Sequence, residues 1–595
     1  MSAAQLPSFG APRNRAFWAR RLDYSWRPSP LLAAAAVVVA AAVYVTVAWS
    51  ARSPALSLDE IVMVGNSRVV AGLPADWPLT GAGFMPGLAI LMAPAWWFTD
   101  SAVVVYQFGV WITVALALLA IWPLSAIALR AGLSRPAGII VSAVVVVAPS
   151  RALLANYLLA ESGLLLTTAA LVVAADRLWE RHRTSDALWF GAAVGATVLF
   201  HGRGVGTAVA AGLWTLLLLR RDPKRAIVAG GSALILAIGA YLLYRGVTAE
   251  VIGSDVRVVN AFGDPSGRDV RASIASVIGQ LWYPTLAWPA VVVTGGMAMI
   301  RWRSRGGMAR FVLLAMVIGL IVSTLQLNPH QGLTRTDPWF YGRYMDQWWT
   351  VLAVVGLALL VRLRWPLVSG AAIVGSVVAG LGMLFITVPD MPRGMQWVDV
   401  HVLGISPWLS LDAYANGKEQ SWGLIVLTGI VLALLVVVLG LIRLWLLPVV
   451  AVLWMWLSIA QDIQRIDVNS GDRDPTSDSL GLNLGLIPAG ARVGIDQNLG
   501  VEGNILVFDA DPRLVARVDS HSPPDGVDVV YVGWFASNNP PPGVKVLAPT
   551  VGKKFVVWVF LGEAARQLDA ERLLVVPSQP PAPDSSATKS PSSAP

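Results

Sequence analysis

Cysteine is absent from the sequence, and charged residues are scarce. Without Cys the chain has no disulfide framework and no thiol chemistry. Asp, Glu, Lys and Arg make up only 13% of the 595 residues, whereas hydrophobic residues make up 56%. A soluble domain does not carry that apolar load, so the composition predicts a polytopic α-helical membrane protein.

Several functional signatures are also missing. The sequence has no P-loop, no Gly-rich dinucleotide fingerprint after a strand and no HExxH motif, and its five His residues are too few for a His-rich metal site. The net charge of +8 comes from basic residues scattered among short loops. That distribution is typical of membrane topology and not of nucleic-acid binding. We therefore expect no nucleic-acid partner.

The hydrophobic runs predict about thirteen membrane-spanning helices. Several runs are shorter than the roughly 20 residues that cross the hydrocarbon core, so they require flanking residues or tilted packing. The predicted spans are residues 31–50, 102–128, 137–149, 152–175, 187–200, 204–219, 226–244, 283–300, 309–326, 347–361, 366–388, 422–442 and 444–461.

Basic residues predict the orientation of these spans. The basic tail at residues 1–30 and the short basic loops are expected in the cytoplasm. The longer loops 51–101, 245–282, 327–346 and 389–421 are then outside. The apolar stretch after the tail has no good cleavage site, which predicts a retained anchor and a multi-pass plasma-membrane protein.

One more apolar stretch, residues 85–98, is interpreted as a helix at the outer membrane interface. Counting it as a span would put the Arg-rich segment 301–310 outside. Trp96 and Trp97 at its end suit an interfacial position.

The last predicted span delivers a polar, Gly/Pro/Asp-rich segment, residues 462–576, to the outer side. Short apolar runs predict a small extracytoplasmic α/β domain there, and the Pro/Ser-rich residues 577–595 predict a disordered tail. The predicted strands are 492–496, 504–508, 528–532, 544–548 and 555–561, with a helix near 512–518.

Two adjacent carboxylates, Asp59 and Glu60, follow the first predicted span. One carboxylate there can deprotonate a hydroxyl, and two can share a metal ion or divide the roles of base and orienter. The alternative is a solvated loop pair, since charged residues are mostly on the surface. Their place outside, on the same side as Arg203 and Arg343, favours a functional role.

Glu161 is an ionisable residue inside a predicted span, about three helical turns below the outer surface. Such a residue is a functional candidate because leaving it unpaired in the membrane is costly. Helical spacing predicts that Tyr157 and Glu161 share a face. The alternative is a structural ion pair with Arg203 or Arg151.

A short outer turn, His201-Gly202-Arg203-Gly204, joins two predicted spans. Its glycines allow close approach of the backbone to a ligand, and His201 and Arg203 can bind an anion. The alternative is a simple turn with an Arg side chain that reaches the interface.

The outer loop before residue 347 is dense in His, Arg, Tyr and Asp and includes His330. Arg343 between Tyr341 and Tyr344 suits a lipid-linked phosphate, because a guanidinium binds phosphate through two N–H groups and the Tyr hydroxyls add donors. The alternative is an aromatic belt with an interfacial Arg.

This layout resembles the GT-C superfamily of membrane glycosyltransferases. The shared features are a short N-terminal tail, a first span, a long outer loop that begins with Asp59-Glu60, many further spans and an extracytoplasmic C-terminal α/β domain. The segment Tyr341-Gly342-Arg343-Tyr344 is similar to the basic outer-loop motif that contacts donor phosphate in such proteins. The composition and tail are similar to those of actinobacterial members, where arabinofuranose and mannose transferases for cell-wall polymers are common.

The resemblance implies an inverting glycosyltransferase with a polyprenyl-phosphate-linked sugar donor and a glycan, lipid or protein acceptor in the cell envelope. Asp59 would take the proton from the acceptor hydroxyl. Glu60 would orient the acceptor or help to hold a divalent metal such as Mg or Mn. Arg343, Arg203 and His330 would neutralise the phosphate, and Glu161 would belong to the substrate-binding set.

Two other classes of function remain open. A transporter or flippase of lipid-linked sugars would also use intramembrane charges, but it usually has repeated halves with interrupted helices, and the sequence shows no such repeat. A non-catalytic envelope-assembly protein would retain the fold without the chemistry.

Overall fold

The computed structural model describes residues 27–442 and 485–575 apart from short gaps. Most of the predicted tail 1–30, the predicted span 444–461, His330 and the predicted tail 577–595 lie outside the described residues. The gaps are residues 50, 57, 75–78, 82, 182, 256–268, 304–305, 328–334, 363–365, 393–396, 417–419, 511–513, 534–539 and 548–554.

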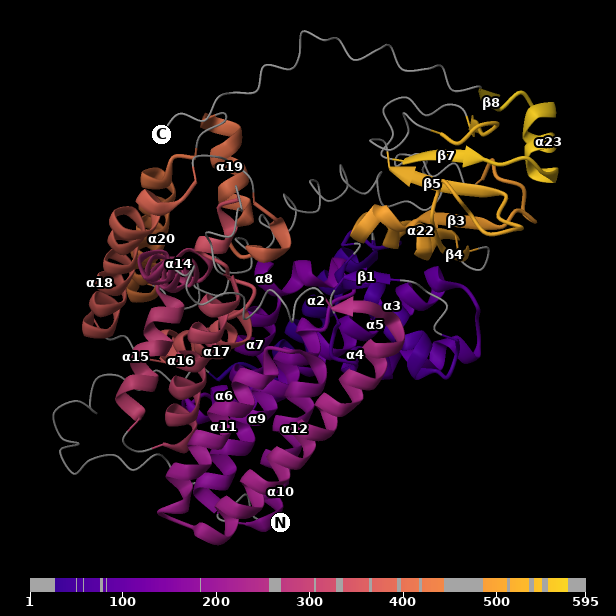
Figure 1. Ribbon diagram of the computed structural model, residues 1–595. Helices are drawn as coiled ribbons and strands as arrows, with labels where there is room; N and C mark the ends of the chain where they lie inside the picture. The colour runs from indigo at the N-terminus through magenta and orange to yellow at the C-terminus, as the bar shows by residue number, and fades with distance from the viewer. Residues whose placement is uncertain are drawn as a thin grey trace, which may run out of the picture.

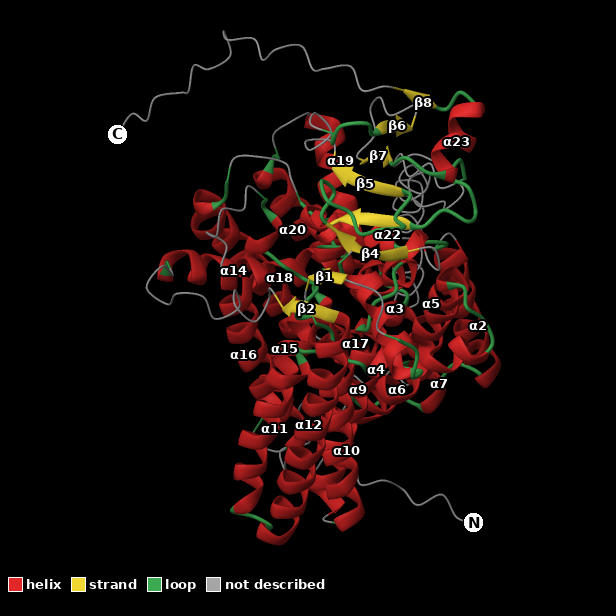
Figure 2. Cartoon of the chain, turned by 45° about the vertical axis from the view of Figure 1, so that its right-hand side comes forward, coloured by secondary structure: helices red, strands yellow, loops and turns green. Residues whose placement is uncertain are grey.

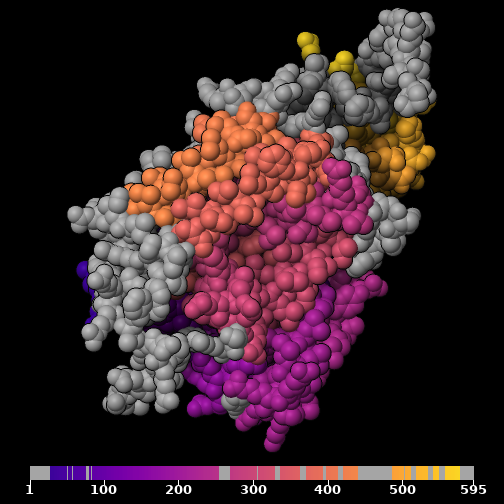
Figure 3. Space-filling model, turned by 90° about the vertical axis from the view of Figure 1, so that its left-hand side faces the viewer, coloured from indigo at the N-terminus to yellow at the C-terminus, as the bar shows by residue number. Residues whose placement is uncertain are grey.

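Residues 27–442 form a helical body, and a small sheet domain follows it (Figures 1 and 2). In the space-filling view, the residues from about 270 to 440 form the middle and upper part of the face shown, and residues from earlier in the chain form its lower part (Figure 3). The first half of the body comprises α2 (Pro30–Trp49), α3 (Asp59–Val70), α4 (Gly87–Met92), η1 (Ala93–Trp97), α5 (Ala102–Leu119), α6 (Ile121–Arg130), α7 (Arg135–Val146), α8 (Pro149–Ala152), η2 (Leu153–Asn156), α9 (Glu161–Arg181), α10 (Thr184–Phe200), α11 (Gly204–Leu219) and α12 (Pro223–Val251). The second half comprises α14 (Val270–Ala287), α15 (Val291–Trp302), α16 (Gly307–Leu327), η4 (Asp337–Trp339), α17 (Asp346–Arg362), α18 (Pro366–Gly382), η5 (Met383–Thr387), η6 (Val388–Asp390), η7 (Asp399–His401), α19 (Ser406–Asn416) and α20 (Trp422–Ile442).

Long apolar helices confirm a multi-pass membrane protein. In the described part of the chain, 7 helices are long and apolar enough to cross a membrane, and up to 9 if each of two bent pairs counts as one span. The predicted number of about thirteen spans is therefore not confirmed. α12 exposes Leu234, Ile235 and Leu242. A long helix with large exposed apolar side chains suits contact with lipid.

Two predicted spans are wrong because the chain bends within or beside them. Predicted span 283–300 crosses a bend of 116° between α14 and α15. Pro289 disfavours helical backbone at Trp288, and Ala290 has a positive φ of 61°, so the helix ends and restarts there. Predicted span 152–175 begins at the last residue of α8 and includes η2 and the non-helical residues 157–160, whereas α9 begins at Glu161.

The predicted interfacial helix at 85–98 is two short helical segments, α4 and η1. Trp97 is exposed, as a membrane-interface residue would be. Trp96 is instead buried and donates its indole N–H to Ser67 Oγ at 2.9 Å. The prediction that both Trp residues lie at the interface is therefore wrong for Trp96, which packs against α3.

The sheet domain has the strand order β4-β3-β5-β7-β6-β8, in which β4, β3 and β5 are parallel and the other pairs are antiparallel. This mixed arrangement confirms an α/β domain. Its elements are β3 (Val493–Asp496), η9 (Gln497–Glu502), α22 (Gly503–Ala510), β4 (Leu514–Val518), β5 (Val529–Gly533), β6 (Lys545–Leu547), β7 (Phe555–Val559), α23 (Glu563–Ala570) and β8 (Leu574–Val575).

Two elements of this domain were predicted the wrong way round. The predicted strand 504–508 lies in helix α22, and the predicted helix near 512–518 contains strand β4. α22 packs against β3 on one side and against α3, α5 and β1 on others. Because α22 is buried on several sides, its sequence is a continuous apolar run and not the amphipathic pattern of a surface helix. Such a run is typical of a buried strand.

α22 is also the element that attaches the sheet domain to the helical body (Figure 1). Strand β1 (Leu79–Gly81) pairs in parallel with β2 (Ile252–Asp255) on the body. The Asn504 side chain accepts the Thr80 N–H at 3.0 Å and donates to the Thr80 carbonyl at 2.8 Å. The ring of Phe508 packs edge-on against Tyr106 of α5. The domain is thus held on the segment that follows α3.

Candidate functional site

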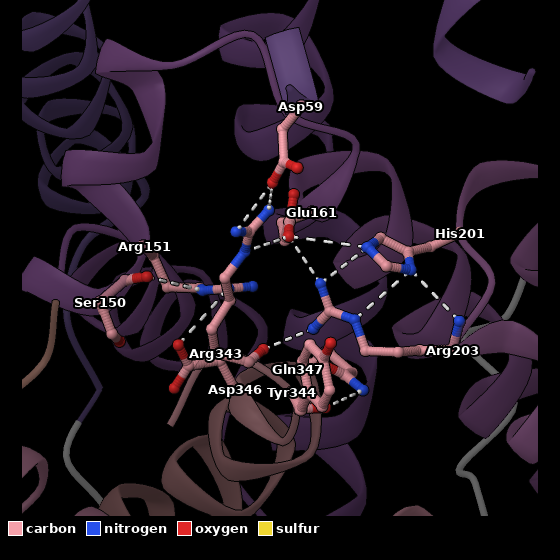
Figure 4. A network of polar contacts seen from close by, with 10 residues as sticks. All are labelled: Asp59, Ser150, Arg151, Glu161, His201, Arg203, Arg343, Tyr344, Asp346 and Gln347. Carbon is pink, nitrogen blue, oxygen red and sulfur yellow. Dashed lines mark hydrogen bonds and ion pairs between the residues drawn. The ribbon is translucent and has the colours of Figure 1, made fainter. Parts of the chain in front are cut away.

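Three carboxylates at helix N-termini contact arginine side chains in one region of the helical body (Figure 4). Asp59, Glu161 and Asp346 are the first residues of α3, α9 and α17. Arg203 directly precedes α11. A helix N-terminus carries a partial positive charge, so this convergence favours carboxylates and bound anions. The side chains form one buried charged cluster, which comprises Asp59, Arg151, Glu161, Arg203, Arg343 and Asp346.

Glu161 is the hub of this cluster. Its Oε1 accepts the Nε–H of Arg343 at 2.6 Å and an Nη2–H of Arg203 at 2.5 Å. Arg203 also donates from Nη1 to the backbone carbonyl of Arg343. A single carboxylate therefore fixes two guanidinium groups that come from segments far apart in the sequence.

Asp59 is the second partner of Arg343. Both Nη groups of Arg343 donate to Asp59 Oδ2, each at 3.2 Å (Figure 4). The side chain of Asp59 is 13% exposed, compared with 7% for Arg343. Asp59 therefore lies at the more open end of the pair.

His201 completes the cluster on the Arg203 side. Its Nδ1 accepts the backbone N–H of Arg203 at 3.2 Å, and its Nε2 lies 3.7 Å from Glu161 Oε1. Burial lowers the pKa of His201 to about 4, so the ring is neutral at neutral pH and adds no cation. Gly204 lies against the backbone of α10, so this glycine serves helix packing and not the predicted approach to a ligand.

The segment with Tyr341 and Tyr344 connects the cluster to a second polar pair. The guanidinium of Arg203 lies 5.0 Å from the centre of the Tyr344 ring, a cation–π distance. Tyr344 packs on Tyr341 at 4.5 Å between ring centres. Burial raises the pKa of Tyr341 well above its ordinary value, which keeps the hydroxyl protonated and able to donate. Gly342 is required because a Cβ would overlap the ring of Tyr283.

The second polar pair is Asp337 with His401. His401 Nδ1 lies 2.6 Å from Asp337 Oδ2, and the His401 ring stacks on Tyr341 at 4.4 Å. The backbone carbonyl of His401 accepts the N–H of Arg343 at 3.0 Å. This pair therefore fixes both the aromatic stack and the backbone that carries Arg343.

Arg151 and Asp346 form a buried ion pair at 3.9 Å at the base of the cluster. In the described part of the chain, Arg151 Nη2 makes no hydrogen bond, and neither does Glu161 Oε2. Buried polar atoms usually have hydrogen-bond partners, so such atoms indicate capacity for a further polar ligand.

Glu60 faces away from this cluster and has a different environment. Its Oε2 accepts the N–H groups of Ala55 and Leu56, each at 2.6 Å. Its Oε1 accepts the Tyr106 hydroxyl at 2.7 Å and the Leu158 N–H at 2.8 Å. Glu60 is completely buried and ties the start of α3 to two other segments.

The Asp59–Glu60 pair does not fit a shared metal ion. Asp59 is directed at Arg343, while both oxygens of Glu60 accept hydrogen bonds from neighbouring groups. Among the described residues, no group of three or more His, Cys, Asp and Glu side chains is arranged to hold a metal. A divalent ion needs several oxygen ligands directed at one point, which this pair does not present.

The predicted setting of Glu161 within a helix is wrong. The chain is not helical at residues 157–160, so Tyr157 and Glu161 do not share a helix face, and Glu161 begins α9 instead of lying within it. The Glu60 carboxylate takes the N–H of Leu158 that a continuous helix would use.

The structure brings together Asp59, Glu161, His201, Arg203 and Arg343, with Tyr341 and Tyr344 beside them. His330 lies outside the described residues. The sequence reasoning did not select Arg151, Asp346, Asp337 or His401 as site residues. One signal was available for Asp346, which is an acidic residue at the start of an apolar span, as Glu161 is.

Solved structures that share this fold include two of one protein. The crystal structure of ArnT from Cupriavidus metallidurans bound to undecaprenyl phosphate covers 90% of this chain and 99% of its own, at 15% identity and a TM-score of 0.56. The same protein in the apo state covers 89% and 98%, at 16% identity and a TM-score of 0.52. The likeness shows that the chain shares the fold of that protein. No protein-family model matches the chain, and no curated protein does.

Proposed function

We propose that the protein is an inverting glycosyltransferase that moves a sugar from a polyprenyl-phosphate donor to an envelope acceptor at the outer face of the membrane. One observation carries the proposal. A carboxylate, Asp59, lies in contact with Arg343, a guanidinium that suits phosphate, where helix N-termini meet. The likeness to ArnT bound to undecaprenyl phosphate supports the choice of a lipid phosphate.

The reaction is a single displacement at the anomeric carbon. The Asp59 carboxylate takes the proton of an acceptor hydroxyl as the acceptor oxygen bonds to that carbon. The bond from the anomeric carbon to the phosphate oxygen breaks, and its electron pair leaves with the polyprenyl phosphate. Arg343 and Arg203 stabilise that charge, and the Tyr341 and Tyr344 hydroxyls donate hydrogen bonds to it. No step uses a metal ion.

The other residues hold these groups in place. Glu161 orients both arginines, and Glu60 fixes the first turn of α3, so these two act as positioning residues. The unmet donor of Arg151 offers a further contact to the donor phosphate. With the N-terminus in the cytoplasm, the sheet domain lies outside, where it would help to recruit a glycan acceptor. Arabinofuranose and mannose are the proposed donor sugars.

The experiment uses the purified protein in vesicles with polyprenyl-phosphate arabinofuranose or mannose, labelled in the sugar, and an envelope glycan as acceptor. We expect label on the acceptor, and we expect Arg343→Gln to reduce transfer at least about 100-fold. Arg271→Gln, on an exposed residue of α14, is the control and should transfer normally. Movement of the labelled lipid across the bilayer without transfer to any acceptor would instead identify a flippase.

A further inference from the structure

Arg343 holds its two carboxylate partners unequally. Its bond to Glu161 is short, at 2.6 Å, and Arg203 reinforces Glu161 from the other side at 2.5 Å. Its two bonds to Asp59 are both 3.2 Å long and converge on one oxygen atom. Charge-assisted hydrogen bonds are strongest when they are short and when two N–H groups each donate to a different carboxylate oxygen, so Asp59 is the weaker partner.

Asp59 is also the partner that an incoming ligand meets first. The Glu161 side chain is 2% exposed, whereas that of Asp59 is 13% exposed. The Nη edge of Arg343, which is the edge that binds carboxylate or phosphate through two N–H groups, is therefore covered by Asp59 alone among the partners described.

The charge of the cluster favours a phosphate that replaces Asp59 on Arg343 over a phosphate that is added beside it. The six side chains of the charged cluster are three guanidinium groups and three carboxylates. A phosphate added to this balanced set would leave a surplus of buried negative charge, which is costly. If the phosphate instead replaces Asp59 on Arg343, the charges of the buried groups stay balanced. The extra negative charge is then that of the displaced Asp59, at the more exposed end of the cluster.

The backbone beside Asp59 allows its side chain to move alone. Glu60, the next residue, anchors the first turn of α3 through four hydrogen bonds. Release of Asp59 from Arg343 therefore requires a change of side-chain rotamer while the helix start stays in place.

We infer that Asp59 occupies the donor-phosphate position on Arg343 in the resting protein, and that the donor displaces it. This inference rests on the proposed function. Once displaced, the carboxylate no longer shares its charge with the guanidinium and is free to accept a proton from the acceptor. The base is then available only when the donor is bound, so the donor binds before the acceptor is activated.

The experiment measures the dissociation constant of undecaprenyl phosphate, which carries no sugar and so supports no turnover, for the full-length protein in detergent. Removal of the competing carboxylate in Asp59→Asn should tighten binding about fivefold or more, since the whole population is then competent to bind. Asp59→Ala should change binding in the same direction. Arg343→Gln should weaken binding at least about tenfold. Asp100→Asn, on an exposed residue before α5, should bind as the wild type does.

The outcomes separate this inference from the proposed function. Equal or weaker binding by both Asp59 variants, at wild-type melting temperature, overturns the exchange while leaving the proposed function intact. No detectable binding of undecaprenyl phosphate by the wild-type protein would overturn the proposed function, and the inference with it.

Discussion

Successive side chains on an α-helix point about 100° apart, and this decides what Asp59 and Glu60 can do. At the start of α3 one carboxylate faces the charged cluster, and the other faces the packed segments around Tyr106 and Leu158. Neighbours in sequence thus become a candidate base and a structural anchor. Glu60, the anchor, is fully buried. Full burial is unusual for a carboxylate unless its oxygens accept hydrogen bonds.

Glu60→Gln tests the structural role. An amide NH₂ would replace one carboxylate oxygen and face N–H donors that need an acceptor, so we expect a loss of about 2–3 kcal/mol and a melting temperature lower by several degrees. Transfer per folded molecule should change little. A variant that melts like the wild type but has lost transfer would show that Glu60 belongs to the catalytic groups.

The sequence was sufficient to put Asp59, Arg203 and Arg343 on one side of the membrane by charge counting, and to name Arg203 as a partner of Glu161 in the alternative interpretation. It was insufficient for pairs such as Asp337 with His401, whose partners lie in different loops and have no fixed spacing. The direction of each side chain could not be predicted either, since it depends on the residue at which each helix begins.

Among the helices and strands, the site depends mostly on the residue at which each helix begins. The predicted span 204–219 coincides with α11, and 422–442 with α20. The bend between α14 and α15 follows Trp288-Pro289, so a proline signal was present there. The sequence carried no such signal for α22 and β4, which were predicted as a strand and a helix. α22 is buried against both the sheet and the helical body, so it has no amphipathic pattern.

Asn504→Ala tests how α22 attaches the sheet domain. The amide side chain makes two hydrogen bonds to the backbone of Thr80, and their loss should cost about 1–3 kcal/mol at this contact. We expect faster amide hydrogen exchange in β1 and α22. Asn498→Ala is the matched control, because Asn498 is exposed and bonds to Asp496 within the domain. Equal amide hydrogen exchange in the two variants would show that the Asn504 side chain does not attach the sheet domain to β1.

In the molecule as a whole, α22 joins the sheet domain to the helical body, and α22 carries a partly buried acid, Asp509. Burial raises the pKa of Asp509 from 3.8 to about 7. A carboxyl whose pKa is raised by folding stabilises the folded state fully only below its unfolded pKa. That contribution falls as the pH rises from about 4 to about 7, and is constant above this.

Asp509→Asn should therefore raise the melting temperature at pH 8 and have almost no effect near pH 4. The difference should grow by at most about 1.4 kcal/mol per pH unit across that interval. Asp525→Asn, on an exposed residue of the same domain, serves as the control with no pH-dependent gain. Melting curves in detergent at several pH values measure both, and a gain that is independent of pH would contradict the titration of Asp509 in this range.

Asp59 is proposed to be the base of the glycosyl transfer, and the transfer rate of Asp59→Asn tests this role. The asparagine keeps the size of the side chain but cannot take a proton. We predict that kcat falls by about 10²–10⁴ at an unchanged melting temperature, while Asp100→Asn transfers at the wild-type rate. A folded Asp59→Asn protein that transfers sugar within about twofold of the wild-type rate would contradict the claim.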